Sequence, residues 1–195
     1  MDKKIYNKWY AMINRCKTDY QFYSNVTICE EWMEFKSFEK WYLENIYDFN
    51  GILELDKDLF SDSKKIYSPD TCCLLPKEIN LLINAANSKN DLLPGVTRNI
   101  GKKSITYTAT IIHGRKELKQ TFKTQLDAFQ FYKTQKEKVI KEVAEKYRDV
   151  LPYWIYSKLI RFEIPMTCEI LENAIKNKEK MRPEAYEEII NSFKV

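Results

Sequence analysis

Apolar positions between Lys4 and Tyr47 recur with the period of an α-helix. Tyr6, Tyr10 and Ile13 lie near one stripe with Trp9 beside it. A second stripe of the same period contains Trp32, Phe35, Phe38, Trp41 and Tyr42. We expect two helices whose aromatic side chains are buried together as a core, in preference to a platform for stacking bases.

The pattern changes after Gly51 to short apolar runs. Ile52–Leu55 and Cys72–Leu75 predict two strands, separated by a polar loop with a turn at Tyr67-Ser68-Pro69-Asp70. Pro76 is typical of a first helical turn, so we expect a helix running toward Ala86. The predicted order is strand, loop, strand, helix, followed by a polar linker over residues 87–91.

Alternating residues then predict a three-stranded sheet over Gly95–Arg98, Ile105–Ile112 and Lys116–Phe122. The turns are expected at Gly101 and at His113-Gly114. In the middle strand Thr106, Thr108 and Thr110 share one face, and Tyr107, Ala109 and Ile111 share the other.

Helical periodicity returns in a long segment from Thr124 to Tyr147, which should pack against one face of that sheet. Further helices are expected at Pro152–Phe162 and within Thr167–Phe193. The fold class is therefore α+β, with an aromatic-rich helical leader, a ββα module, a three-stranded antiparallel sheet on a long helix and a helical C-terminal tail. The expected segments are 1–93, 94–150 and 151–195.

Composition agrees with a globular protein that stays in the cytoplasm. The 195 residues are 44% hydrophobic and 31% charged, and no apolar run approaches the roughly 20 residues that a membrane span requires. No apolar run follows the first charges, which argues against a signal peptide. Five cysteines without an export signal favour reduced thiols. A zinc site of Cys16, Cys29 and Cys72-Cys73 is not favoured, because no C-x-x-C motif and no nearby histidine accompany them.

The distribution of charge is more informative than its total of +4. The segment from Gly95 to Lys123 contains seven basic residues and one acidic residue, Glu117, so the rest of the chain is slightly acidic. Such a basic island is typical of a surface that contacts phosphates, although a solvated hairpin is the alternative on charge alone.

Three parts of the chain resemble domains of phage and mobile-element endonucleases. Leu55-Asp56-Lys57-Asp58, Tyr67-Ser68-Pro69-Asp70-Thr71-Cys72 and Pro76-Lys77-Glu78-Ile79-Asn80 resemble the ββα-metal (His-Me) finger of phage and mobile-element HNH endonucleases, in the branch with Asp-Lys or Asp-Arg in place of Asp-His. Trp9-x-x-Met12-x-x-Arg15-Cys16, Cys29-Glu30-Glu31-Trp32 and Phe38-x-x-Trp41 resemble the leader of the same branch. Gly95 through Tyr147 resembles the Apetala-type DNA-binding domain that follows such fingers in homing endonucleases.

The resemblance implies a Mg²⁺-dependent DNA endonuclease or nickase in which Asp56 and Asn80 hold the metal. The usual base, a histidine, is replaced by Lys57. Acidic neighbours do not lower the pKa of a lysine, so Lys57 is better suited to contact a phosphate or to form a salt bridge than to activate water. Tyr67 is the other candidate for a base or nucleophile, although a tyrosine in such a turn is more often a packing residue.

The Apetala resemblance implies that the sheet enters the major groove of double-stranded DNA, with long side chains reading bases from its outer face. Arginine can address guanine with two hydrogen bonds, whereas lysine more often neutralises phosphates. The candidate contacts are Arg98, Lys102, Lys103, Thr106, Thr108, Arg115, Lys116 and Lys119.

Three functions remain open on the sequence. The first is the metal-dependent endonuclease, and the second is a catalytically inactive DNA-binding protein, favoured by the missing histidine. The third is a phage interaction protein that inhibits a host nuclease through contact with a host protein or nucleoprotein. No membrane partner is expected, and the place of action would be the cytoplasm of a bacterial host.

Overall fold

The computed structural model describes residues 2–18, 26–61, 65–84, 92–102 and 104–164. By their contacts the residues form two compact units, Met1–Asn84 with Val143–Ile160, and Ala85–Glu142 with Arg161–Val195. This division differs from the expected segments, because residues 143–160 belong with the first unit. Within the described residues, no helix combines the length and apolar character needed to cross a membrane.

The first unit begins with the helices that carry the aromatic residues. These are α1 (Lys3–Thr18), the 3₁₀ helix η1 (Glu30–Met33) and α2 (Phe35–Asn45). Trp32 and Phe38 are fully buried and meet edge to face with ring centroids 5.0 Å apart. The aromatic core is confirmed, but Tyr10 is exposed and does not belong to it. Ile5 and Met12 are buried on α1 instead.

The expected strand, loop, strand, helix order is confirmed in β2 (Leu53–Asp56), β4 (Cys73–Pro76) and α3 (Lys77–Ile83). β2 and β4 pair antiparallel, with Asp56 opposite Cys73. The intervening loop also contains β3 (Ile66–Tyr67), which pairs parallel with β1 (Thr27–Ile28). That pairing was not predicted, and it ties the loop to the leader.

Helix α5 (Tyr153–Ile160) confirms the helix expected after Pro152 and lies in the first unit. Ile155 and Leu159 are buried, and Trp154 packs on Phe60 with ring centroids 5.0 Å apart. The linker expected at residues 87–91 and the helix expected within Thr167–Phe193 lie outside the described residues.

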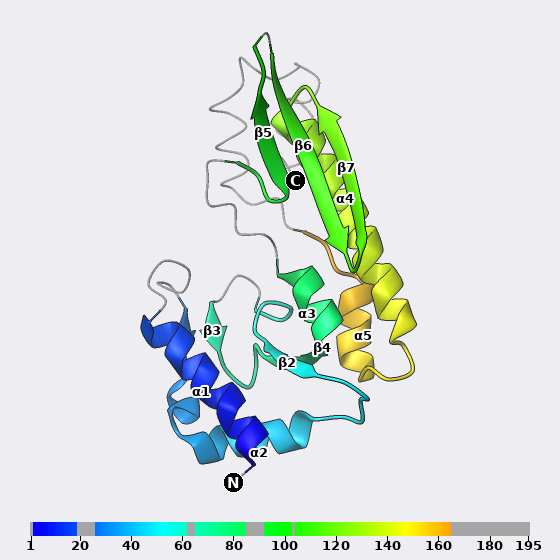
Figure 1. Cartoon of the computed structure of the whole chain (residues 1–195). Coiled ribbons are helices and arrows are strands. Elements are labelled where there is room, and N and C mark those ends of the chain that lie inside the picture. The colour runs from blue at the N-terminus through cyan, green and yellow to red at the C-terminus, as the bar shows by residue number, and fades with distance from the viewer. Residues whose placement is uncertain (1, 19–25, 62–64, 85–91, 103, 165–195) are drawn as a thin grey trace, which may run out of the picture. The chain divides into compact units, whose positions relative to one another are not determined.

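The second unit contains β5 (Val96–Ile100), β6 (Ile105–His113), β7 (Lys116–Phe122) and most of α4 (Gln125–Lys146). The strands form an antiparallel sheet in the order β5-β6-β7, and one face of it packs on α4 (Figure 1). Ala109 and Ile111 of β6 meet Phe129 and Tyr132 of α4 in a buried cluster. The expected three-stranded sheet on a long helix is therefore confirmed.

Gly95 allows the chain to enter this sheet close to α4. Its φ is +70°, and a Cβ atom at this position would lie 2.1 Å from the ring of Tyr132. Only glycine adopts this conformation readily and leaves room for that ring.

Candidate functional site

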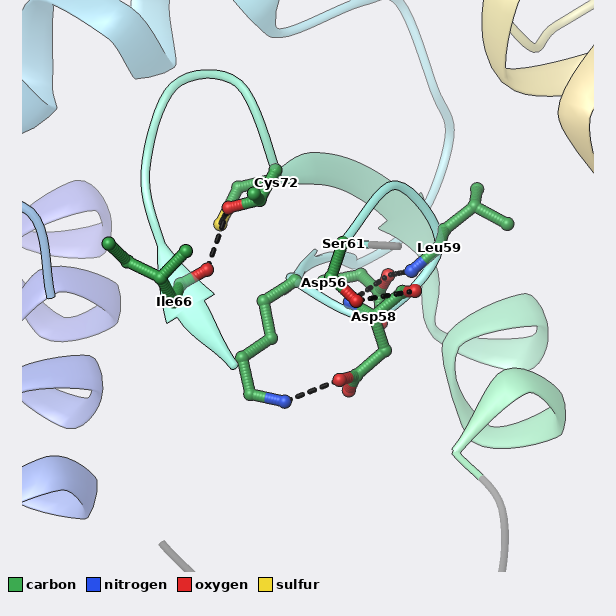
Figure 2. Close-up of polar contacts among 8 residues, drawn as sticks. Asp56, Asp58, Leu59, Ser61, Ile66 and Cys72 are labelled. Atoms are coloured by element: carbon green, nitrogen blue, oxygen red, sulfur yellow. Dashed lines mark hydrogen bonds and ion pairs between the residues drawn. The ribbon is translucent and has the colours of Figure 1, made fainter. Parts of the chain in front are cut away.

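Asp56 shapes the turn that follows β2. Its side chain is 2% exposed, and its Oδ1 accepts the backbone N–H groups of Asp58 at 3.0 Å and Leu59 at 2.8 Å (Figure 2). Ser61 Oγ donates to the carbonyl oxygen of Asp58 at 3.3 Å within the same turn. A carboxylate that accepts two backbone donors is fixed in position without help from another side chain.

Burial raises the pKa of Asp56 from 3.8 to about 6. The negative charge of Asp58 adds to the rise, while the two backbone hydrogen bonds and the charge of Lys57 oppose it. The ionised form is therefore costly in this position, and a bound cation would stabilise it.

Lys57 and Tyr67 lie together, and a third residue joins them. Lys57 Nζ forms an ion pair with Asp58 and lies 5.8 Å from the centroid of the Tyr67 ring. The guanidinium of Arg15, on α1, lies 5.9 Å from the same centroid. Tyr67 is only 2% exposed. Two cations thus lie near one buried aromatic ring, and one of them, Lys57, follows Asp56 in the chain.

Asn80, the other candidate ligand, lies on α3. Its Oδ1 is buried and has no hydrogen-bond partner within the described part of the chain. A buried acceptor without a donor costs about 1–3 kcal/mol. Glu78, on the same helix, joins α3 to the end of α4. Its Oε2 accepts hydrogen bonds from Lys146 Nζ at 2.7 Å and from the Tyr147 hydroxyl at 2.6 Å.

The donor set suits magnesium better than zinc. Magnesium prefers oxygen ligands, usually one or two carboxylates, and keeps several waters and substrate phosphates as the others, so the Asp56 carboxylate and the Asn80 amide oxygen are each of a suitable type. Across the described residues, no three side chains of the His, Cys, Asp and Glu types gather into a metal site. Burial raises the pKa of the Cys16, Cys29 and Cys73 thiols, and that of Cys72 to about 12, whereas zinc binds the thiolate.

The outer face of the β5-β6-β7 sheet, which points away from α4, is rich in threonine. Thr106, Thr108 and Thr110 alternate with Tyr107, Ala109 and Ile111, as the pattern predicted. Thr108 Oγ1 accepts from Asn99 Nδ2 at 2.8 Å and shares a hydrogen bond of 2.9 Å with Thr121 Oγ1. These hydroxyl and amide groups form an exposed polar ladder across the three strands.

The strand register divides the basic residues between the two faces. Lys119 pairs with Thr110 and lies on the outer face, where it forms an ion pair of 2.9 Å with Glu117. Arg98 pairs with Tyr107, and Lys116 pairs with His113, so both lie on the side of the sheet that faces α4. The expectation that Arg98 and Lys116 project from the outer face is wrong, although both residues are exposed.

Other basic residues lie in the connections between strands. Lys102 is exposed between β5 and β6, and Arg115 is exposed between β6 and β7. His113 pairs with Lys116, so the hairpin turn is Gly114-Arg115, one residue later than predicted, with Gly114 at φ +60°. Lys103 lies outside the described residues.

Arg15 lies near Tyr67, although the sequence assigned it no role beyond the leader motif. Its position could have been anticipated from the spacing of Lys4, Lys8 and Arg15, which fall on one stripe of a helix. Its contact with Tyr67 depends on how α1 packs, which the sequence does not reveal.

Comparisons of the chain with protein-family models, with curated proteins and with solved structures found no match.

Proposed function

We propose that the protein binds double-stranded DNA through the outer face and the ends of the β5-β6-β7 sheet. The observation that carries this proposal is an open polar face on β6, with exposed basic residues in the connections at its two ends, Lys102 and Arg115. Hydroxyl groups such as those of Thr106 and Thr108 can donate to or accept from base edges and phosphates.

The dimensions of the sheet agree with this arrangement. A nine-residue strand such as β6 is about 30 Å long, whereas the major groove is about 12 Å wide. A sheet of this length in the groove brings its two ends to the phosphates on either side. Lys102, Arg115, Lys116 and the outer-face Lys119 would neutralise phosphates.

The test is the salt dependence of binding to duplex DNA, followed by fluorescence anisotropy. The variant carries Lys102→Gln, Arg115→Gln, Lys116→Gln and Lys119→Gln, and the control carries Lys36→Gln, Lys40→Gln, Lys65→Gln and Lys138→Gln, with the same change in net charge. Each lost phosphate contact reduces the magnitude of the negative slope of log K against log salt by about 0.9, so we expect that magnitude to fall by about 3 to 4 for the variant. Equal slopes for the two proteins would overturn the proposal.

A second candidate function is metal-dependent cleavage of the bound DNA. The observation that favours it is the buried, unpartnered Oδ1 of Asn80 together with the raised pKa of Asp56. Asp56 and Asn80 would hold Mg²⁺, which polarises a phosphate and stabilises its developing charge. Lys57 would contact the phosphate, and Tyr67, because it is buried, would support Lys57 without reacting itself.

This function is tested with supercoiled plasmid in the presence of magnesium, manganese or EDTA. The wild type is compared with an Asp56→Ala, Asn80→Ala double variant, and the shift of the melting temperature with magnesium gives a readout that does not need activity. Metal-dependent nicks and a magnesium-dependent shift, both absent from the variant, are the expected result. Intact plasmid that both proteins retard on a gel would leave DNA binding alone.

A further inference from the structure

A cleft of about 520 Å³ lies in the first unit, between α1 and β2 with the segment that precedes it. Buried Tyr42 and Leu53 contribute to its lining, and Ile46 and Ile52 line it with side chains that are largely exposed. The size is in the range of cavities that hold ligands, about 300–1,000 Å³. Neither the candidate metal ligands nor the basic sheet contributes to this cleft.

The wall formed by α1 is basic. Lys4, Lys8 and Arg15 line the cleft from one stripe of the helix, and the small Ala11 between them leaves space. The acid that lines the opposite wall, Glu54, pairs with Lys8 at 2.9 Å across the cleft. Asp2 lies near the Lys4 end, where its Oδ1 accepts the backbone N–H of Lys4 at 2.8 Å. Positive charge therefore exceeds negative charge along this wall.

The length of the basic stripe indicates a row of anions. From Lys4 to Arg15 the helix rises about 16 Å, which is much longer than one phosphate group. Successive phosphates of a DNA strand advance about 3.4 Å each along the duplex axis, so the stripe matches several of them. A single small anion would contact only one part of this row of cations.

Arg15 connects this cleft with the candidate site around Asp56. It lines the cleft and also lies over the Tyr67 ring, at 5.9 Å from the centroid, where Lys57 approaches the same ring at 5.8 Å. Both cations approach the same ring, so a chain of phosphates that follows Lys4, Lys8 and Arg15 leads toward Lys57.

We propose that a nucleic-acid strand lies along this cleft, with its phosphates on Lys4, Lys8 and Arg15, and continues to Lys57. The first unit then holds a second phosphate-binding surface, separate from that of the sheet. The inference rests on the proposed DNA binding and adds a path for one nucleic-acid strand that leads to Lys57. Single-stranded and double-stranded DNA share the phosphate chemistry, and both are used as probes.

The test compares the full-length chain with a Lys4→Gln, Lys8→Gln, Arg15→Gln variant. The matched control is Lys3→Gln, Lys17→Gln, Lys36→Gln, which removes three exposed cations that do not line the cleft. We expect the magnitude of the slope of log K against log salt to fall by about 2 to 3 for the variant on duplex DNA, or by about 2 on a single strand, and to stay near the wild-type value for the control. Slopes that match the control on both probes would overturn the inference.

Glu54→Gln tests the same surface by a substitution that should increase the affinity for DNA. This substitution removes the carboxylate that holds Lys8 and frees the lysine for a phosphate, so the affinity for DNA should rise severalfold. An affinity for DNA that does not rise, or that falls, would contradict binding along this cleft, because breaking a purely structural ion pair would not strengthen binding.

The sheet variant and the cleft variant together distinguish failure of the inference from failure of the proposed function. If the sheet variant weakens binding and the cleft variant does not, the inference fails while the proposed function stands. If neither variant changes the slope, the proposed function itself fails. Because Arg15 is half-buried, a Lys4→Gln, Lys8→Gln variant that leaves Arg15 intact is measured alongside. We expect the magnitude of its slope to fall by about 1 to 2 and its melting temperature to stay unchanged.

Discussion

The turn after β2 and the outer face of the β5-β6-β7 sheet both hold polar side chains in hydrogen bonds, but in opposite surroundings. Asp56 is 2% exposed, and Asn80, on the helix that follows the hairpin, has a buried Oδ1. On the sheet, Thr108 bonds to Asn99 and Thr121 in a network that is open to solvent. The same kinds of groups therefore carry very different costs in the two regions.

The difference separates stability from binding. A buried polar group gives up its hydration, so its ionisation and its hydrogen bonds alter the free energy of unfolding. An exposed group exchanges one hydrogen-bond partner for water and alters the free energy of unfolding little. Substitutions near Asp56 should change the stability of the fold, whereas substitutions on the sheet should change contacts with DNA.

The largest expected effect is a gain in stability from Asp56→Asn. Because the folded-state pKa of Asp56 is raised from 3.8 to about 6, its contribution to stability is complete below about pH 3.8 and is lost as the pH rises through 6. Asparagine keeps an oxygen for the N–H groups of Asp58 and Leu59 and cannot ionise. We expect the free energy of unfolding at pH 7 to rise by about 3 kcal/mol, measured by urea denaturation.

The pH dependence provides the control for that substitution. At pH 3 the wild-type carboxyl is protonated, so the two proteins should differ by less than about 0.5 kcal/mol. Asp58→Asn, at a neighbouring side chain that is 43% exposed, should not reproduce the gain. A wild type that is more stable than Asp56→Asn at pH 7 would show that the carboxylate stabilises the turn in its ionised form.

Asn80→Leu should give the next largest effect. The substitution replaces an amide whose oxygen is buried and has no donor in the described structure with an apolar side chain of similar size. We expect the unfolding free energy to rise by about 1 kcal/mol, because the desolvation cost of that oxygen is removed. Asn84→Leu, at the exposed C-cap of the same helix, is the matched control and should show no gain. A loss on Asn80→Leu would instead mean that the amide has a partner in solution.

Local pattern was sufficient for much of this fold. Alternation placed Thr106, Thr108 and Thr110 opposite Ala109 and Ile111, because the side-chain period of a strand does not depend on its neighbours. Helical periodicity likewise predicted α4, and Pro76 marked the start of α3. In each case the deciding interaction lies within a few residues of sequence.

The features that the sequence did not reveal depend on pairing over long separations. The parallel pairing of Thr27 with Ile66 involves a strand of two residues, which is too short to leave a periodic signal. The placement of Arg98 beside Tyr107 depends on strand register, because a shift by one residue would move it to the other face. The approach of Arg15 to Tyr67 depends on helix packing in the same way.

The smallest effect on stability should come from Thr108→Val. Valine has nearly the same shape, but it breaks the hydrogen bonds to Asn99 at 2.8 Å and to Thr121 at 2.9 Å. Because water replaces both partners on an exposed face, the unfolding free energy should change by less than about 0.5 kcal/mol. Affinity for duplex DNA should nevertheless fall severalfold, with the salt slope unchanged, because a hydroxyl contact is lost while no phosphate-neutralising charge is removed.

Thr110→Val, two residues along the same face, is the control for position. If Thr108→Val cost more than about 1.5 kcal/mol and left binding intact, the ladder would be a structural element of the sheet, and the separation between the two regions would fail.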